Sequence, residues 1–439
     1  MADLALELAK QFFAIREGEL VIGGAAVSAI AHRHGTPCFL YDCKVIDRKL
    51  EALRQALPSR FSVCYSVKAN PLPAVLRHFL ARGCRLEVAS VGEFRLAVEA
   101  GCKPEDILFA GPGKTEVELE QVIACAIGEI HLESITEATR VAAICKRLGK
   151  RANVAIRVNP AEQAEGGAMR MGGRPAVFGV DEESLDAVLD VVCAEATLVF
   201  RGLHLFAGTQ ILDAAVLANQ YRHGLEIARR VVRRLGSPLS TMDFGGGLGI
   251  RYFPHETELN LDHLKERLSV LFAEVEGDPA FNGTHFLVEP GRFLVGECGV
   301  YVARVNDIKV SRGKKFLILD GGMNHHLAAS GNLGQAIKRN FPVAIVNKLD
   351  ESPTENVDVV GPLCTPLDTL ARNVSLPEAE IGDLLGIFQS GAYGRSASPT
   401  SFLSHPAPAE VLVDSDGRMA TFESSDEASR VTCTVDPVT

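Results

Sequence analysis

A lysine closes an apolar, β-type run in the segment CYSVKANP, residues 64–71, just before the chain turns at Asn70 and Pro71. Most lysines in such a place reach for solvent. An amine that is partly desolvated at a strand end is also a group that attacks carbonyl compounds. The rest of the sequence must decide between a solvated Lys68 and a nucleophilic one.

Polar residues recur where the other apolar runs end. Beside Lys68 they are Glu87 with Ser90, Gly111, Glu133, Arg157, His204, Gly245 to Gly247, and Glu289 with Arg292. Taken singly, Arg157 is explained by an ordinary salt bridge and His204 by a satisfied place in the core. Glu87 and Glu93 are explained as surface charges. Together, a polar group at nearly every run end predicts an active site.

A glycine run points to the kind of ligand. FGGGLGI, residues 244–250, lets backbone N–H groups approach an anion closely, although tight turns use such runs too. It is not the spaced GxGxxG of a dinucleotide fold. EPGR, residues 289–292, follows one run later with a carboxylate and a guanidinium. A phosphate cradle, a carboxylate and a strand-end lysine suggest pyridoxal 5'-phosphate, with the carboxylate keeping the pyridine nitrogen protonated.

Short apolar runs that alternate with amphipathic stretches must position these residues. The runs are FSVCYSV, CRLEVAS, DILFAGP, EIHLES, NVAIRVNP, VFRGLHLFAG, TMDFGGG and HFLVEPGR. Eight βα units in series predict a TIM (β/α)8 barrel, in which chemistry sits where the strands end. An open doubly wound sheet also alternates strands and helices, but the count favours the barrel.

After residue 295 the sequence becomes β-rich with few helical stretches, which predicts a C-terminal β domain. The opening FFAIREGELVIGG is also of strand–turn–strand type. The Gly-rich loop at 160–179 is either a surface insertion or a lid over the site. The predicted domains are N-terminal strands joining the β domain at 1–35, the cofactor-binding barrel at 36–295, the β domain at 296–413 and a flexible tail at 414–439.

Composition indicates which classes of partner are disfavoured and in which cellular compartment the protein is expected. The 439 residues carry a formal net charge of -10, which disfavours nucleic acid and anionic membranes as partners. Eleven cysteines occur without CxxC pairs, which is typical of reduced cytosolic thiols and not of a zinc cluster. No signal peptide and no membrane-spanning run is recognisable, so we expect a cytoplasmic protein without a metal.

At these residues the sequence resembles the fold-type III pyridoxal-phosphate decarboxylases, the family of the diaminopimelate, ornithine and arginine decarboxylases. The motifs that carry the resemblance are, in the family's order, YSVKAN, GLHLFAGTQ, FGGGLGI, EPGR, GPLCTPLD and GAYG. The resemblance extends from FLYD at residue 39 to GAYG at residue 391. It implies an α/β fold with an alanine-racemase-like barrel plus a β domain, and a homodimer with shared active sites.

The resemblance also implies roles for single residues. Lys68 would be the Schiff-base lysine, and His204 would stack on the pyridine ring. Cys364, from the partner subunit, would return a proton to Cα. The implied cofactor-binding residues are Lys68, Glu93, Arg157, His204, Gly245, Gly246, Gly247, Glu289, Arg292 and Tyr393, and the implied substrate residues are Arg292, Cys364 and Thr365.

Two departures from the family pattern bear on the substrate. Ornithine and diaminopimelate enzymes follow the GPxC cysteine with Asp or Glu, which holds a distal ammonium group, whereas Thr365 stands here. The Arg-Pro-x-x-Tyr stretch that serves a distal carboxylate is replaced by HHLAASGNLGQAIKRNFPVAI. An unpaired buried charge is costly, so the pocket is predicted to take a distal group that is neither ammonium nor free carboxylate.

GGMNHHLAASGN and CTPLD resemble the subgroup of the L-glutamyl–acyl-carrier-protein decarboxylase and the exosortase-associated decarboxylases. We therefore expect α-decarboxylation of an L-amino acid, with a glutamyl group on an acyl carrier protein as the substrate. One alternative is a free amino acid, including diaminopimelate. Another is a non-catalytic homologue that binds and regulates a partner. A racemase is disfavoured, because alanine racemases pair the pyridine nitrogen with arginine where Glu289 stands.

Overall fold

The computed structural model describes residues 4–161, 169–170, 175–206, 208–335, 337–414 and 416–422. Much of the predicted lid at 160–179 and most of the predicted tail at 414–439 lie outside these ranges. No helix within the described ranges is long and apolar enough to cross a membrane. The chain forms two compact units. They are the barrel unit, 51–250 and 257–291, and the β unit, 1–50, 251–256 and 292–439.

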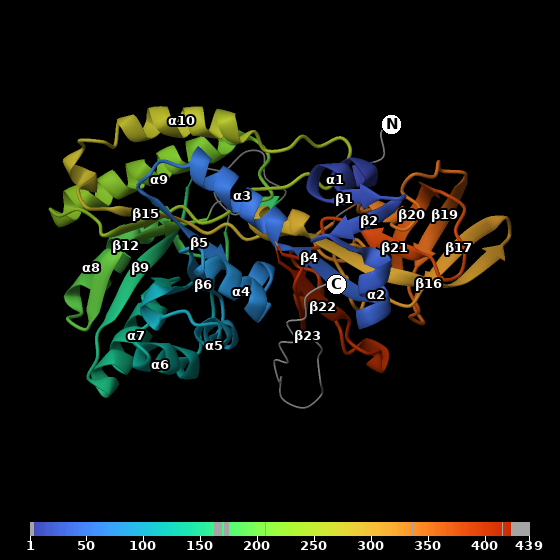
Figure 1. Ribbon diagram of the computed structural model, residues 1–439. Helices are drawn as coiled ribbons and strands as arrows, with labels where there is room; N and C mark the ends of the chain where they lie inside the picture. Colours follow the sequence, from blue (N-terminus) through green and yellow to red (C-terminus); the bar gives the residue numbers. More distant parts are fainter. Residues whose placement is uncertain are drawn as a thin grey trace. The chain divides into compact units, whose positions relative to one another are not determined.

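Eight parallel strands close into a ring in the barrel unit (Figure 1). In chain order they are β5 (Phe61–Ser66), β6 (Arg85–Val88), β7 (Ile107–Phe109), β8 (Glu129–Leu132), β9 (Ala152–Asn159), β12 (Leu198–Leu205), β14 (Thr241–Asp243) and β15 (His285–Val288). Each strand pairs with the next one, and β15 pairs with β5 to complete the circle. The eight predicted runs are these eight strands, and the predicted barrel is confirmed.

The barrel unit's helices follow the strands. They are α4 (Pro73–Leu80), α5 (Val91–Glu99), α6 (Glu116–Ala124), α7 (Ile135–Leu148), α8 (Leu185–Ala194), α9 (Ala214–Leu235) and α10 (Leu261–Ala273). Several start at a capping side chain. Ser90 accepts from the Glu93 amide at α5, Thr115 and Glu118 form a capping box at α6, and Ser134 caps α7. Because a cap satisfies otherwise unpaired amides, it fixes where the loop leaves each strand end.

The interior of the barrel contains ionisable groups where such barrels usually hold branched apolar side chains. Glu129 and His131 lie two residues apart on β8, so they face the same side of the strand, and both are buried. Thr241 Oγ1 donates to Glu129 Oε2 at 2.9 Å. Since β14 and β8 are not neighbours in the sheet, this hydrogen bond crosses the interior. The nearby apolar cluster consists of Cys64, Leu108 and Leu287.

The β unit is built on a nine-stranded sheet. Its strands are β4 (Cys38–Asp42), β16 (Gly299–Ser311), β17 (Lys314–Leu319), β18 (Val343–Ile345), β19 (Glu355–Val360), β20 (Thr369–Leu376), β21 (Leu384–Ile387), β22 (Ala409–Val413) and β23 (Met419–Phe422). Strand β4 lies in the range predicted for the barrel, yet it pairs with β16 and β22. All five residues of β4 are buried, as expected for a strand inside a sheet.

The N-terminal segment of the β unit forms a small sheet of its own. Its strands are β1 (Ala14–Arg16), β2 (Glu19–Ile22) and β3 (Ala25–Ala26), and its helices are α1 (Leu4–Phe12) and α2 (Val27–His34). Leu20 and Ile22 of β2 belong to the same apolar core as Val300 and Val302 of β16. The amide of Leu20 also donates to Val346 O at 2.8 Å. The domain boundaries drawn from the sequence stay a prediction.

Candidate active site

Lys68 lies in the 3-10 turn Val67–Ala69 that directly follows β5. Its Nζ is 3.1 and 3.0 Å from the two carboxylate oxygens of Glu87, the second-last residue of β6. Ser66 Oγ donates to the same carboxylate at 2.5 Å. The Lys68 side chain is 45 % exposed, whereas that of Glu87 is fully buried. Lys68 is therefore an ion-paired amine at the edge of the site, and not the apolar amine suggested by its surroundings in the sequence.

Glu289 and two histidines form a buried cluster. Glu289 Oε2 lies 3.1 Å from His204 Nε2, and Glu289 Oε1 lies 3.9 Å from His131 Nδ1. The 3.1 Å contact has ion-pair distance, but the two ring nitrogens of His204 do not meet hydrogen-bond geometry. The two imidazole centroids are 4.4 Å apart. The sequence reasoning found Glu289 and His204 but missed His131, although its alternation with Glu129 and Glu133 was visible.

Electrostatics set the charges in this cluster. Burial lowers the pKa of His204 and favours its neutral ring, while the Glu289 carboxylate opposes this shift. Burial opposes ionisation of Glu289, but His204, His131 and Lys68 outweigh it and hold the pKa of Glu289 below its usual range. Burial, and then the charge of Glu289, raise the pKa of Asp243 well above its usual value. Ionisation is thus favoured at Glu289 and disfavoured at Asp243.

The glycine run follows β14 and tolerates no side chain. Gly245 and Gly247 have φ values of +65° and +92°, a region that L side chains rarely adopt. A Cβ on Gly246 would come 2.4 Å from the carbonyl oxygen of Glu289. The amide of Gly245 donates to Asp243 Oδ1 at 2.8 Å. The glycine run therefore places backbone without side chains next to Glu289. One of the run's amides, that of Gly245, is already hydrogen-bonded to Asp243.

Arg157 and Glu93 were predicted as cofactor residues, and the structure places both in contacts that order loops. Arg157 Nη1 donates to the buried Glu133 at 2.9 Å. Glu133 also accepts from the amides of Gly111 and Gly179, at 3.0 and 2.5 Å. Glu93 Oε2 accepts from the amide of Ala89 at 2.7 Å, directly after β6. Both side chains thus support strand-end loops of the barrel.

The remaining predicted residues lie in the β unit. Arg292 Nη1 donates to the Tyr252 hydroxyl at 2.7 Å, and its guanidinium carbon lies 4.7 Å from the ring centroid of Tyr393. The sequence had not singled out Tyr252. Partial burial of Arg292 opposes its charge, but Tyr252 and Tyr393 nevertheless raise its pKa. A guanidinium held between two phenols is suited to an anion.

Cys364 is exposed, as are only two others of the ten cysteines in the described part of the chain. Thr365 Oγ1 accepts from the Leu367 amide at 3.3 Å. The loop is anchored by Asp368, which accepts from the amides of Leu363 and Met323 at 2.9 and 2.6 Å. The thiol is therefore presented at the surface of the β unit by a fixed loop.

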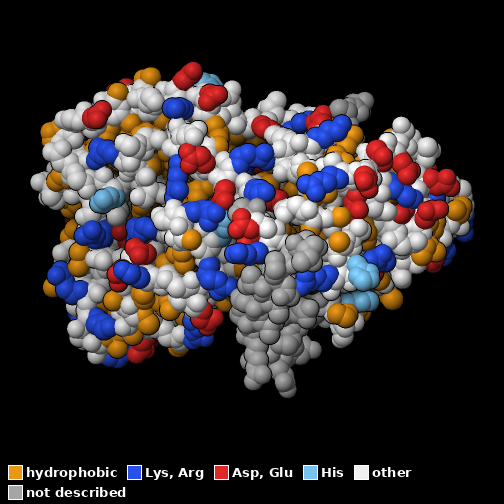
Figure 2. All heavy atoms as spheres, in the orientation of Figure 1, with side chains coloured by type: hydrophobic (Ala, Val, Ile, Leu, Met, Phe, Trp, Pro, Cys, Tyr) orange, Lys and Arg blue, Asp and Glu red, His pale blue; other side chains and the backbone are white. Residues whose placement is uncertain are grey.

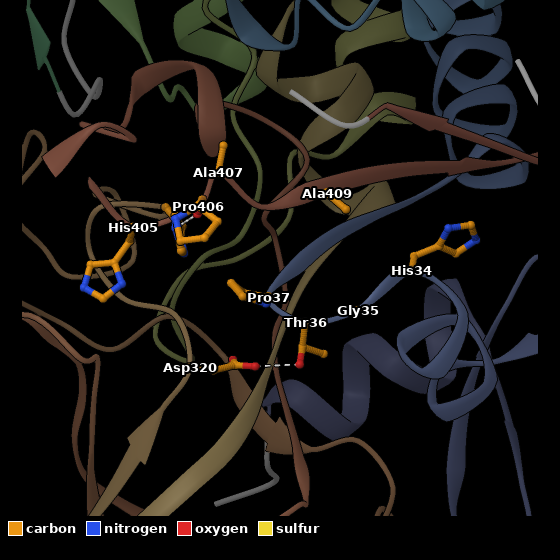
Figure 3. A pocket seen from close by; sticks show the side chains of 10 residues that line it. His34, Gly35, Thr36, Pro37, Asp320, His405, Pro406, Ala407 and Ala409 are labelled. Carbon is orange, nitrogen blue, oxygen red and sulfur yellow. Dashed lines mark hydrogen bonds between the residues drawn. The ribbon is translucent and has the colours of Figure 1, made fainter. Parts of the chain in front are cut away.

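A cavity of about 380 Å³ elsewhere in the β unit is lined by His34, Asp320, His325 and His405 among others (Figure 3). The Thr36 hydroxyl donates to Asp320 there at 2.5 Å. None of the predicted site residues lines this cavity. On the face seen in Figure 2, acidic and basic side chains are interspersed, without a continuous basic area such as nucleic acid binding uses.

Comparison with known proteins identifies the family to which this chain belongs. Residues 43–296 match the family described as pyridoxal-dependent decarboxylase, pyridoxal binding domain. The chain belongs to this family. It is 37% identical, over 391 residues, to the L-glutamyl-[BtrI acyl-carrier protein] decarboxylase of Niallia circulans, covering 88% of this chain and 91% of that protein. It is 32% identical to the diaminopimelate decarboxylase of Aquifex aeolicus, covering 93% and 94%.

The crystal structure of M. jannaschii diaminopimelate decarboxylase in complex with L-lysine matches this pyridoxal-dependent decarboxylase with a TM-score of 0.84. The identity is 25%, and 93% of this chain and 94% of the other are covered. The predicted family, fold, cofactor and reaction class are confirmed. The decarboxylase therefore uses pyridoxal 5'-phosphate.

The residues present fit this cofactor. Glu289 Oε1 is a buried acceptor without a hydrogen-bond partner among the described residues. Buried acceptors normally have a partner, and a protonated pyridine nitrogen would supply one. Arg292 Nε is a buried donor that also lacks a hydrogen-bond partner among the described residues, and a phosphate oxygen would supply one. The donor atoms of His131, His204 and Glu289 lie within 4.8 Å of one another, a spacing that a metal ion could also use. The expectation of no metal stays a prediction.

Proposed function

We propose that this decarboxylase removes the α-carboxylate of an L-glutamyl group carried as a thioester on an acyl carrier protein. Thr365 carries the proposal, because a neutral hydroxyl cannot balance a buried distal ammonium group. A thioester leaves the distal end of glutamate uncharged. The relative from Niallia circulans, named for a substrate of this kind, supports the proposal.

When bound, pyridoxal 5'-phosphate withdraws electrons from the bond to the departing carboxylate. Lys68 would hold the cofactor's aldehyde carbon, Glu289 would bind its pyridine nitrogen and His204 would lie against its ring. The ionised state of Glu289 favours a protonated pyridine nitrogen, which strengthens the electron sink. The neutral state of His204 avoids a second positive charge beside it.

Each unit by itself offers groups suited to a phosphate: the glycine run in the barrel unit, and Arg292 with Tyr393 in the β unit. Gly246 and Gly247 are the stronger candidates in the run, because the amide of Gly245 is bonded to Asp243. Arg292 and Tyr393 supply a guanidinium and a hydroxyl from the β unit. Glu93 and Arg157 act indirectly, since each orders a loop at a strand end.

Glu87 gives Lys68 a partner for its proton. An ammonium group is not a nucleophile, so Lys68 must lose a proton before its amine can react. The Glu87 carboxylate, 3.0 Å away and buried, is placed to accept that proton and to return it. Ser66 fixes the carboxylate in position.

Cys364 is proposed as the proton donor to Cα, supplied by the partner subunit of a homodimer. Its exposure on an anchored loop suits a residue that serves a neighbouring subunit. Arg292, Cys364 and Thr365 are the proposed substrate residues. Thr365 lies next to Cys364, so it would meet the distal part of a substrate whose Cα faces the thiol.

The carrier protein is proposed to dock beside this loop. Leu333, Ile337 and Leu367 are 41%, 74% and 52% exposed. Asn332 Nδ2 donates to Leu367 O at 3.2 Å, which ties the two segments together. The exposed Lys338 and Arg339 would attract an acidic carrier.

The other cations that could meet an acidic carrier are Lys348, Arg170 and Arg174. Lys348 is only 16% exposed, and its Nζ lies 2.9 Å from Asp383. The side chain of Arg170 and all of Arg174 lie outside the described residues.

Steady-state kinetics on three substrates test the proposal: glutamyl-carrier thioester, free L-glutamate and meso-diaminopimelate. We expect the highest kcat/KM for the thioester. A diaminopimelate decarboxylase is the second candidate, because the relative from Aquifex aeolicus has that activity in its name. If diaminopimelate has the highest kcat/KM, the interpretation of Thr365 is wrong and the second candidate is correct.

A further inference from the structure

A row of buried polar groups leads from the closed interior of the barrel to Glu289. Thr241 Oγ1 donates to Glu129 Oε2 at 2.9 Å, and Glu129 Oε1 lies 3.2 Å from His131 Nε2. His131 Nδ1 then faces Glu289 Oε1 at 3.9 Å. Thr241, Glu129, His131 and Glu289 are at most 8% exposed. The proposed function gives a role to Glu289 alone.

The direction of the hydrogen bond between His131 and Glu129 determines which ring nitrogen of His131 carries a proton. A carboxylate only accepts, so the Nε2 atom that faces Glu129 must carry hydrogen. A bare Nδ1 would then turn a lone pair towards the Glu289 carboxylate, and neither atom has another hydrogen-bond partner among the described residues. A proton on Nδ1 turns this repulsion into an attraction.

The charges of the cluster balance in this arrangement. Buried charges persist only when they are paired. Burial disfavours the charged forms of Asp243 and His204. That leaves the carboxylates of Glu129 and Glu289, which are compensated by a doubly protonated His131 and a protonated pyridine nitrogen.

We propose that His131, held by Glu129, is a positioning residue that carries a proton on both ring nitrogens and keeps Glu289 ionised towards the pyridine nitrogen. This inference rests on the proposed role of Glu289. Without the imidazolium, Glu289 would be a stronger base and would compete with the pyridine nitrogen for its proton.

The test uses holoenzyme loaded with pyridoxal 5'-phosphate that is 15N-labelled in the ring, since the nitrogen's chemical shift reports its protonation. We expect a protonated nitrogen in the wild type. In Glu129→Gln and His131→Asn the shift should move towards the unprotonated value. Their affinity for the cofactor should fall by a factor on the order of ten, as for the loss of one hydrogen bond to a charged group.

Two further variants make the outcome unambiguous. Leu108→Val removes one buried methylene group from the same interior without touching the polar row and should leave the shift unchanged. Glu289→Gln should move the shift most. If Glu289→Gln moves it while Glu129→Gln and His131→Asn do not, the inference about His131 is wrong and the role of Glu289 stands. If Glu289→Gln has no effect, the proposed role of Glu289 fails as well.

Discussion

The Glu289 cluster in the barrel unit and the Cys364 loop in the β unit differ in almost every physical respect. Glu289, His131 and His204 are at most 6% exposed and lie within 4.8 Å of one another at their ligand atoms. Cys364 is exposed. Stabilising charge on a cofactor needs a buried, preorganised environment. Choosing between substrates needs residues that the incoming molecule can reach, so we assign cofactor chemistry to the first region and substrate handling to the second.

The largest expected effect is the loss of activity when the proposed Schiff-base lysine of the barrel unit is removed. Lys68→Ala should remove covalently bound cofactor and lower kcat by a factor on the order of 10⁴ or more, because the nucleophilic amine is lost. Absorbance spectra before and after borohydride treatment, together with CO2 release, measure both effects. Lys103→Ala, at an exposed position, is the control. Wild-type turnover by Lys68→Ala would contradict the assignment.

The next largest effect concerns the β unit. Cys364→Ala should lower kcat by about 10²- to 10⁴-fold, the range for loss of a general acid, while leaving the bound cofactor's spectrum intact. If the partner subunit supplies Cys364, mixing it with Lys68→Ala should restore about a quarter of the sites, by random pairing in a symmetric dimer. Subunit exchange without any recovered activity would exclude a shared site.

A stability effect sharpens the contrast between buried and exposed charge. Glu133→Gln should destabilise the fold by about 3 kcal/mol at pH 7, because it leaves the buried Arg157 uncompensated. Burial opposes the charge of Glu133, but Arg157 and Lys114 outweigh it and lower its pKa below 4.5. The stabilisation is therefore complete above pH 4.5 and is lost as the pH falls through the lowered value.

Chemical denaturation of the wild type and Glu133→Gln between pH 3 and pH 7 measures the stabilisation by Glu133 and its pH dependence. Glu116→Gln breaks an exposed pair with Arg147 and should change stability far less than Glu133→Gln does. An equal loss in the two variants would show that burial of the Glu133 pair is unimportant.

The smallest expected effect is at the proposed docking surface. The double variant Lys338→Glu/Arg339→Glu should raise KM for the carrier thioester by a factor on the order of ten at low salt, and by less at high salt. Turnover of free glutamate should not change. Lys309→Glu, at another exposed position of the β unit, is the matched control. Equal losses on both substrates would argue against a carrier-specific surface.

The sequence predicted the barrel well because buried parallel strands produce continuous apolar runs that end at functional loops. The sequence alone did not reveal the pairing of β4 with β16, because this pairing joins residues about 260 positions apart and depends on tertiary contacts. An apolar run such as CFLYD has the same pattern in either sheet.

Partners inside the site were harder to predict than its members. Glu87 was noticed at a strand end, but only the register of β5 on β6 brings it to Lys68. Glu129 and His131 lie in the run EIHLES, where their spacing indicates a shared face. The contact of Glu129 with Thr241 across the barrel becomes visible only once the ring is closed.

One substitution tests most directly whether substrate choice lies in the exposed loop. Thr365→Asp restores the acidic residue that family members with diamine-type substrates carry. We predict that the ratio of kcat/KM for meso-diaminopimelate to that for the glutamyl-carrier thioester rises by a factor on the order of ten or more, because a buried ammonium group gains a partner. The spectrum of the bound cofactor should not change. An unchanged ratio in a folded, cofactor-loaded Thr365→Asp protein would contradict the account.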